Sequence, residues 1–396
     1  MTGLPQNFPV RATTLVRGAR QLLTLRGPAG PRRGAALGEL GIIPDGAVLI
    51  HGGKILEAGP SRRLENLTLA RGASEINAAG RVVMPGFVDS RTQPVSVPVR
   101  PARRLEAGAQ SVLEGMARHG TTTVAASACA ELGHPAVLAI LRSLGGLSGP
   151  PLDIIRDYYV TAAPAPEFQA THATYAEGIC AEVLPLLARR KLAVLVSVDC
   201  EGVEELAARR ILEQAHSLGF RSTIHAGASA ACVNLAVEMQ AAAVVLDRVA
   251  AGAIAELSVS RPVCTLLPAS IYHRRLAYPP APALIESGAA LTLASGFGFE
   301  QCPTYNMQMV ISLACSEMGM SPAEAISAAT INGAHAVARG HLCGSLEPSK
   351  AADLIVLNIA DYRELPVQFG INHVHMVVKN GHVIYREGEV TSWTGQ

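Results

Sequence analysis

The sequence predicts an α/β fold, a (β/α)₈ TIM-like barrel inserted in a small composite β-sandwich domain that both chain ends form. Eight short, nearly continuous apolar runs alternate with helical stretches in the middle of the chain, as strands of a parallel sheet buried on both faces require. Alternating apolar residues with glycine-rich turns occupy the two ends instead. We expect the composite domain over residues 1–82 and 341–396, and the barrel over 83–340.

The chain ends carry hairpin signals. Ala47 to Ile55 is a short apolar segment, and the turn pairs Asp45-Gly46 and Gly52-Gly53 bound its strands. Near the other end, the Asn380-Gly381 pair is typical of a two-residue hairpin turn. Both ends are therefore expected to contribute strands to one β module.

The middle of the chain repeats a strand and a helix. Glu204 to Leu218 places apolar residues on one helical face, and Ser321 opens another helix with a capping box. Eight such units favour a closed barrel over a doubly wound open sheet. The eight apolar runs are Val82 to Asp89, Thr121 to Ser127, Ile154 to Val160, Ala193 to Asp199, Ser222 to Ala226, Ala241 to Asp247, Val263 to Pro268 and Ala289 to Ser295.

Composition excludes several classes of function. Of 396 residues, 49% are apolar but only 16% are charged, and the formal net charge of +1 disfavours nucleic acid and anionic membranes as partners. The mean hydropathy is +0.27, yet no apolar run is long enough to span a bilayer. Met1 to Val10 lacks the apolar core of an export signal, so we expect a cytoplasmic protein. The 8 cysteines form no Cys-x-x-Cys pair and are expected to be buried thiols.

Several motifs point to one enzyme family. The first apolar run ends in Pro85-Gly86-Phe87-Val88-Asp89-Ser90-Arg91-Thr92-Gln93, which resembles the amidohydrolase signature in which a strand ends in His-Thr-His. Taken with the segments that follow, the chain resembles imidazolonepropionases over roughly Val16 to Gly381. The other matching segments are Arg20 to Thr24, Gly120 to Thr123, Thr223 to Ala226, Leu266 to Pro268, Gly344 to Glu347, Ala352 to Leu354 and Gly370 to His375.

The resemblance implies a mononuclear metal site at the barrel mouth. Its ligands would be two His after the first strand, one His after the fifth, a further His after the sixth and an Asp after the eighth. Imidazoles and a carboxylate around an open coordination position let Zn or Fe lower the pKa of bound water. The family reaction opens 4-imidazolone-5-propanoate in histidine degradation and gives N-formimino-glutamate.

This chain departs from the implied ligand set at nearly every position. Arg91 and Gln93 replace the first-strand ligands, Arg248 stands at the sixth-strand position and Gly296 at the eighth. Only His225 remains. Because a guanidinium has no lone pair to donate and stays protonated, we expect no metal cofactor, with Zn or Fe only if hydrolysis proves metal-dependent.

The arginines allow two arrangements. Arg91 and Arg248 could form internal ion pairs with Asp89, Asp199, Glu201 or Asp247. Alternatively they could join Arg100, which matches the family arginine for the substrate carboxylate, in a cationic pocket for a small anion. His225 is expected either to remain as a ligand or to be a hydrogen-bonded histidine at the mouth.

Three functional hypotheses follow. The leading one is a non-hydrolytic pseudoenzyme that binds a small anionic molecule, or serves as a partner subunit in a homodimer or beside an active paralogue. The second is a metal-dependent hydrolase that opens the C–N bond of a cyclic amide. The third is metal-free catalysis with Arg91, Arg248 and a carboxylate such as Asp199 or Glu201.

Overall fold

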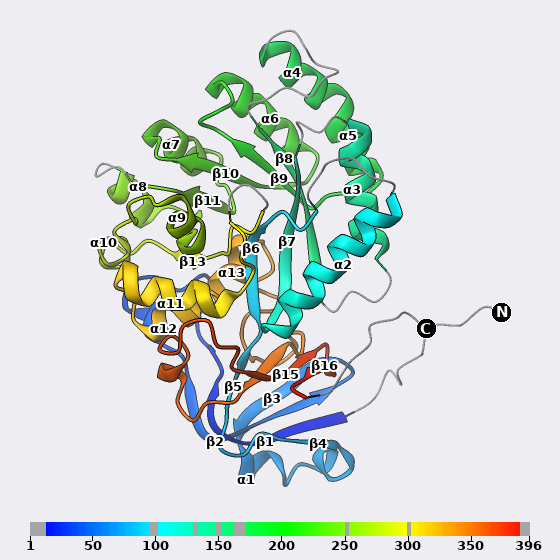
Figure 1. The fold of residues 1–396 in the computed structure, drawn as a ribbon, viewed down its shortest axis with the longest axis vertical. Helices are drawn as coiled ribbons and strands as arrows, with labels where there is room; N and C mark the ends of the chain where they lie inside the picture. The colour runs from blue at the N-terminus through cyan, green and yellow to red at the C-terminus, as the bar shows by residue number, and fades with distance from the viewer. Residues whose placement is uncertain are drawn as a thin grey trace, which may run out of the picture.

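The fold was described from a computed structural model of the chain. It describes residues 13–95, 102–129, 134–147, 152–161, 172–249, 253–298 and 302–388. Figure 1 shows two bodies: a barrel with its surrounding helices above, and a sheet built from the blue and red ends of the chain below. Both ends therefore meet in one β domain, and the barrel is inserted between them.

The lower sheet combines strands from the start and the end of the chain. β5 pairs with β1 on one side and with β14 on the other, which joins the two chain ends. The order is β16-β15-β14-β5-β1-β2-β3, with β4 also paired to β1. The strands are β1 (Thr13–Leu23), β2 (Ile42–His51), β3 (Lys54–Pro60), β4 (Ser74–Asn77), β5 (Val82–Pro85), β14 (Leu354–Leu357), β15 (Val374–Lys379) and β16 (His382–Arg386).

The barrel strands are parallel and follow chain order from β6 to β13. The first and last strands meet through a Thr92–Phe297 bridge and a hydrogen bond of 3.1 Å from the Gly296 amide to the Arg91 carbonyl, which closes the ring. The strands are β6 (Phe87–Thr92), β7 (Thr121–Cys129), β8 (Asp153–Val160), β9 (Leu195–Asp199), β10 (Arg221–Gly227), β11 (Ala243–Leu246), β12 (Val263–Leu266) and β13 (Leu291–Leu293).

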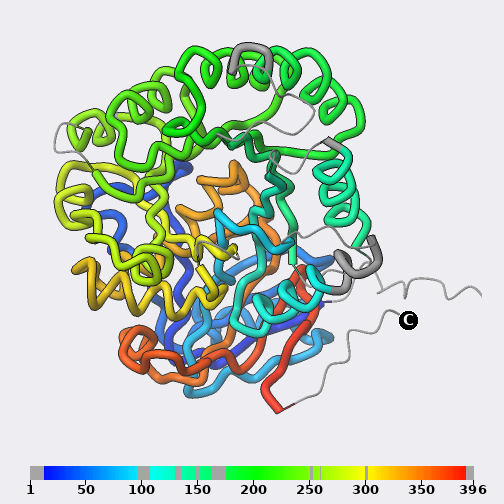
Figure 2. Tube along the Cα trace, turned by 45° about the horizontal axis from the view of Figure 1, so that its top comes forward, coloured from blue at the N-terminus to red at the C-terminus, as the bar shows by residue number. Residues whose placement is uncertain are grey.

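Helices cover the outside of the barrel, as the ring of coils in Figure 2 shows. A π-helical turn over Ile179–Val183 joins α4 and α5. The helices are α2 (Ala102–Arg118), α3 (His134–Gly146), α4 (His172–Gly178), α5 (Leu184–Arg189), α6 (Glu205–Ser217), α7 (Ala230–Glu238), α8 (Ala253–Val259), α9 (Pro268–Arg274), α10 (Ala281–Glu286), α11 (Met307–Met318), α12 (Pro322–Ala328) and α13 (Ile331–Ala336), with α1 (Ser61–Leu64) beside the lower sheet.

The barrel interior changes from apolar to polar along β8. Val88 and Ile155 pack at its lower end against Ala334 of α13. A Cβ on Gly333 would lie 2.6 Å from the Val88 carbonyl oxygen, so only glycine lets the helix approach this closely. Two residues above Ile155, β8 places Asp157 inward, because side chains alternate between the faces of a strand. Apolar side chains and α13 therefore fill the lower end of the barrel, and the polar residue Asp157 lies above them.

A buried lysine joins the sheet to the barrel. Lys379 of β15 donates from Nζ to Asp353 and to Asp153 at the start of β8, at 2.7 Å each. Lys379 and Asp353 are 6% and 4% exposed, so this ion pair is largely shielded from water. It fixes the end sheet against the barrel strand that carries Asp157.

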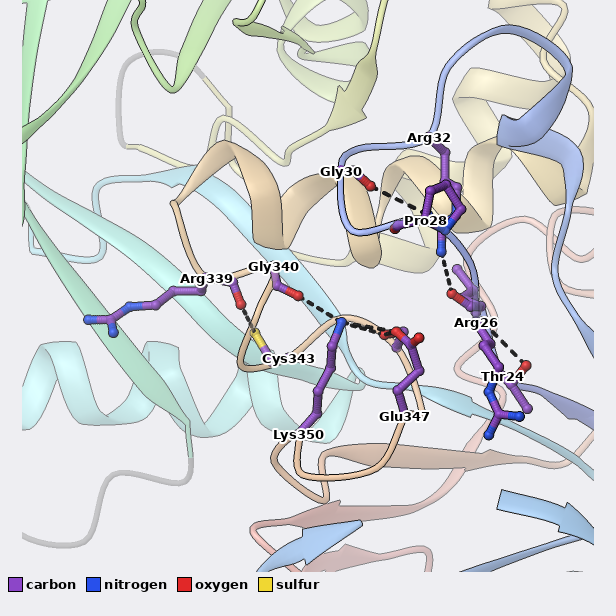
Figure 3. Close-up of polar contacts among 12 residues, drawn as sticks. Thr24, Arg26, Pro28, Gly30, Arg32, Arg339, Gly340, Cys343, Glu347 and Lys350 are labelled. Carbon is purple, nitrogen blue, oxygen red and sulfur yellow. Dashed lines mark hydrogen bonds and ion pairs between the residues drawn. The ribbon is translucent and has the colours of Figure 1, made fainter. Parts of the chain in front are cut away.

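Two loops carry polar contacts of their own, as Figure 3 shows. The Arg32 guanidinium turns back over its own loop and donates to the Leu25 and Pro28 carbonyls at 2.7 and 2.8 Å. Lys350 donates to the Gly340 carbonyl at 2.7 Å and lies 3.2 Å from Glu347. These contacts fix the shape of each loop.

The structure confirms the predicted barrel and the β domain shared by both chain ends. It also bears out the Gly52-Gly53 and Asn380-Gly381 hairpins and the Ser321 capping box. The Asp45-Gly46 turn was wrong, because both residues lie inside β2. The run Val82 to Asp89 is two strands rather than one. They separate at Gly86, where a Cβ would collide with Thr122.

Two further observations bear on the composition. The expectation of thiols alone was wrong, since Cys200 and Cys232 form a disulfide, while the six other cysteines are free. Among the described helices, none is both long and apolar enough to cross a membrane.

Candidate functional site at the barrel mouth

The polar side chains of the barrel gather at the carboxyl ends of its strands. They come from β6, β7, β8, β9 and β10 and from the turn after β11, so separate strand ends supply them. In barrels of this kind the carboxyl-terminal face is where active sites are built. We therefore describe this face as the candidate site and begin with the arginine that ends β6.

Arg91 points into the barrel and is only 5% exposed. Its guanidinium carbon lies 4.0 Å from the centre of the Tyr159 ring, a cation–π contact. Its Nη1 lies 3.4 Å from Ser127 Oγ and 3.7 Å from Asp157 Oδ2. Its Nη2 is buried and has no hydrogen-bond partner within the described part of the chain.

Asp157 is the counterion of Arg91. Both its oxygens accept hydroxyl hydrogen bonds, from Ser127 at 2.7 Å and from Ser197 at 2.8 Å. Burial raises the pKa of the Asp157 carboxyl, while Arg91 and the two serines oppose this rise by stabilising the anion. An arginine stays protonated, so a buried pair results with no net charge.

Tyr159 links this pair to His225. Its hydroxyl lies 3.1 Å from His225 Nδ1. The other ring nitrogen, Nε2, faces Asp247 Oδ1 at 3.8 Å, too far for a hydrogen bond but close enough for an ion pair. Asp247 also binds Arg274 at 2.8 Å, and His225 and Arg274 hold the pKa of Asp247 well below its usual range. A continuous polar chain thus runs from Asp157 to Arg274.

The structure tests the first predicted arrangement, an internal ion pair, for Arg91. Arg91 does form an internal ion pair, but with Asp157, so the four predicted partner carboxylates were wrong for it. The prediction failed because Asp157 is the middle residue of a strand, whereas only residues after strand ends were considered. Asp89 accepts instead from backbone amides, of Ser295 at 3.0 Å and of Arg91 at 3.4 Å.

Within the described residues, no side-chain hydrogen bond or ion pair joins the other predicted site residues to this polar chain. Arg248 follows Asp247 at the barrel mouth and is exposed, so its expected role in binding an anion stays a prediction. Gln93 donates to Cys129 Sγ at 2.6 Å. Gly296 has a φ of +64°, where a side chain would be strained. Arg100 lies outside the described residues, so its expected contact with a carboxylate stays a prediction. Of the predicted residues, Arg91 and His225 share the polar chain through Tyr159.

Asp89 lies beneath the mouth with no exposure to solvent. Burial raises the pKa of its carboxyl to about 6, partly offset by its hydrogen bonds with Ser295. Its second oxygen, Oδ2, is buried without a hydrogen-bond partner within the described residues. The hydrogen bond to Ser295 joins β6 to the end of β13, so this residue helps to close the ring under the site.

Sequence reasoning missed Asp157, Tyr159 and Ser197. A signal was present, because Asp157 and Tyr159 lie two residues apart in one strand and must share a face. The disulfide was also missed. Cys200, the residue after β9, bonds to Cys232 in α7 and so ties the loop beside Asp199 to the helix that follows His225.

A cavity of about 800 Å³ lies at the opposite end of the barrel. Arg221, Val263 and His335 line it, beside the strand starts of β10 and β12. None of the residues in the polar chain borders it, and the amino-terminal face of such barrels serves stability rather than catalysis. The mouth therefore remains the candidate site.

The comparisons with known proteins agree with this architecture. Residues 82–384 match the family model described as "Amidohydrolase family". The chain is 37% identical to an imidazolonepropionase of Solibacter usitatus, over 93% of this chain and 97% of that protein. This chain is an amidohydrolase of the imidazolonepropionase family. Another member, from Geobacillus kaustophilus, is 32% identical over 95% of this chain and 98% of its own length.

Solved amidohydrolase-like structures share the fold. A triazine hydrolase variant superposes with a TM-score of 0.75 at 16% identity, covering 94% of this chain and 95% of that one. An adenosine deaminase from Xanthomonas campestris with bound zinc gives a TM-score of 0.70 at 16% identity, over 94% and 92% of the two chains. Likeness at this identity supports the barrel and its end sheet alone.

Proposed function

We propose that this amidohydrolase opens the C–N bond of a small cyclic amide at the barrel mouth, as the name of its imidazolonepropionase relatives suggests. The observation that carries the proposal is the 37% identity over nearly the whole length of both chains. It favours a hydrolase over the non-hydrolytic pseudoenzyme expected from the sequence. The substrate class is a five-membered ring amide such as 4-imidazolone-5-propanoate.

The residues at the implied metal positions do not fit a divalent cation. Arg91 has only N–H donors, the Gln93 amide nitrogen is directed at Cys129 Sγ, and Gly296 has no side chain to offer. Only His225 has a suitable nitrogen, and the described residues contain no group of three His, Cys, Asp or Glu that could hold a metal. We therefore derive no step through a metal.

His225 is the residue best suited to move a proton. In the tautomer that donates Nδ1–H to the Tyr159 hydroxyl, Nε2 carries a lone pair and can take a proton from water. Asp247, 3.8 Å from Nε2, would stabilise the imidazolium that forms. Arg274 holds Asp247 from its other oxygen at 2.8 Å, which keeps that carboxylate in place. Water attacking the ring carbonyl would meet this base at the mouth.

A second candidate function is binding without hydrolysis, either of the same ligand class or beside an active paralogue. The observation that favours it is the buried Arg91–Asp157 pair, which fills the position where the resemblance implies a metal ligand. A cationic side chain there removes the activated water on which the family reaction is expected to depend. The two candidates share a ligand and differ only in turnover.

Turnover separates the two candidates. We would follow the disappearance of 4-imidazolone-5-propanoate with the wild-type chain, with His225→Ala and with Arg71→Met as a control at an exposed site beside the end sheet. The proposal expects wild-type turnover that falls at least about 100-fold in His225→Ala, since a positioned base contributes about 10²–10⁴-fold. Arg71→Met should keep its rate. Ligand binding without wild-type turnover would replace the hydrolase with the second candidate.

A further inference from the structure

Arg91 has a donor that nothing in the described chain accepts. Nη1 is directed at Ser127 and Asp157, but Nη2 is buried and unpartnered on a side chain only 6% exposed. Leaving a donor of a charged group buried and unsatisfied costs stability. The arginine is nevertheless held in place by its counterion and by the Tyr159 ring beneath it. Such an arrangement indicates a place for a ligand acceptor.

The counterion cannot be that acceptor. Asp157 already accepts from two serine hydroxyls, at 2.7 and 2.8 Å, and meets Arg91 on the Nη1 side. Tyr159 covers one face of the guanidinium with its ring, while its hydroxyl faces His225. An acceptor atom of a ligand would therefore meet Nη2 at the edge of the guanidinium plane and not at the face that the Tyr159 ring covers.

The charge balance selects the kind of acceptor. Because Asp157 already neutralises Arg91, a carboxylate on Nη2 would leave a net negative charge in a buried site, at a cost of several kcal/mol. A neutral carbonyl oxygen satisfies the donor without that cost. This disfavours the anion pocket considered from the sequence and favours an amide carbonyl.

A second unpartnered atom belongs to the histidine beside the hydroxyl of the same tyrosine. His225 Nε2 is buried without a hydrogen-bond partner in the described residues, and Tyr159 contacts both His225 and Arg91. The guanidinium thus lies over the Tyr159 ring, and the imidazole lies beside its hydroxyl. A cyclic amide can meet the donor with its carbonyl while water at that carbonyl meets the imidazole.

We propose that Arg91 Nη2 binds the ring carbonyl oxygen of the ligand, so that a side chain of this protein supplies the cation at the position where the resemblance implies a metal. This inference rests on the proposed ligand class but not on turnover. In hydrolysis, negative charge develops on that oxygen as water adds to the carbonyl carbon. A fixed guanidinium would stabilise the charged oxygen that develops in the transition state more strongly than it stabilises the neutral carbonyl oxygen of the bound ligand.

The test uses two probes that differ at the ring carbonyl. Hydantoin-5-propanoate and imidazole-4-propanoate share a five-membered ring and a propanoate, but only the first has ring carbonyl groups. We would measure their Kd values by calorimetry with the wild type and with the double variant Arg91→Met/Asp157→Asn, which removes both buried charges and keeps the site neutral. Arg91→Lys is the second variant, and Arg71→Met is the control for loss of a cation at an exposed site beside the end sheet.

The inference expects a selective loss. The double variant should bind hydantoin-5-propanoate at least about tenfold more weakly, the equivalent of one charged hydrogen bond, with imidazole-4-propanoate within about twofold. Arg91→Lys should lose less than the double variant, and Arg71→Met should leave both Kd values unchanged.

Equal weakening of both probes would overturn the inference in favour of a carboxylate site. Unchanged binding in folded double and lysine variants, or a wild type that binds neither probe, would also overturn it. Thermal melts establish folding for each variant. Carbonyl-selective binding without any turnover would leave the inference standing and remove the proposed hydrolysis.

Discussion

The guanidinium carbon of Arg91 lies 4.0 Å from the centre of the Tyr159 ring, while the Tyr159 hydroxyl lies 3.1 Å from His225 Nδ1. One tyrosine thus contacts both residues that remain at the site from the sequence prediction. An aromatic face stabilises a cation at its centre, and the hydroxyl at its edge orients an imidazole. The relative position of the arginine and the histidine therefore depends on a residue that no motif marked.

The first prediction concerns the buried ion pair. Asp157→Asn should lower the free energy of unfolding by about 3–5 kcal/mol, because it leaves the Arg91 charge buried without a counterion. Urea unfolding measures this change. The matched control is Glu177→Gln, which breaks an exposed pair with Arg210 and should cost less than about 1 kcal/mol. A similar small loss in both variants would contradict the buried pair.

The second prediction concerns Asp89. Its folded pKa of about 6 lies above the unfolded value of about 3.9. Between these values the unfolded chain has released the proton that the folded chain still holds, so stability falls as pH rises from about 4 to 6. The fall amounts to about 3 kcal/mol and is absent below about pH 4. Unfolding titrations across this window should show it for the wild type.

Asp89→Asn should remove that fall, because the amide does not titrate and its oxygen can still accept from the Ser295 amide. Glu213→Gln, which changes an exposed carboxylate, should retain the wild-type pH dependence. A fall of equal size in Asp89→Asn would assign the titration to another group.

The barrel could be predicted from the sequence because buried parallel strands need continuous apolar runs, and eight of them were visible. The site could be predicted only where it follows strand ends, as with Arg91 and His225. Asp157 escaped because the role of a polar residue within a barrel strand depends on its neighbours on the adjacent strands, here Ser127 on β7 and Ser197 on β9, which are far away in sequence. Which strands close the ring, and which residues pair between strands, depends on contacts between segments far apart in the sequence.

The third prediction concerns the disulfide. Titration of the denatured, unreduced chain should find six thiols, since Cys200 and Cys232 are bonded to each other. Replacing both with alanine should lower the free energy of unfolding by about 2–4 kcal/mol. Eight thiols in the unreduced chain would show that the bond is absent. Cys180→Ala, at a free cysteine, is the control.

The fourth prediction concerns the junction between sheet and barrel. Lys379→Met should lower the free energy of unfolding by about 3–5 kcal/mol, because the Asp353 carboxylate stays buried without its cation. Adding Asp353→Asn should recover part of the loss. Asp153→Asn removes only the half-exposed partner, so it should cost less than about 1 kcal/mol. A larger loss in Asp153→Asn would contradict this prediction, because the Lys379–Asp153 pair and not the Lys379–Asp353 pair would then stabilise the junction.

Metal dependence of turnover is the most direct test of the central claim, hydrolysis of a cyclic amide by residues of this chain at the barrel mouth. We would measure kcat/KM for 4-imidazolone-5-propanoate with protein treated with a chelator, with elemental analysis of the same sample, and again after adding Zn or Fe. The account predicts turnover by metal-free protein that added metal does not raise and that His225→Ala abolishes. No turnover in either preparation, or turnover only with bound metal, would contradict it.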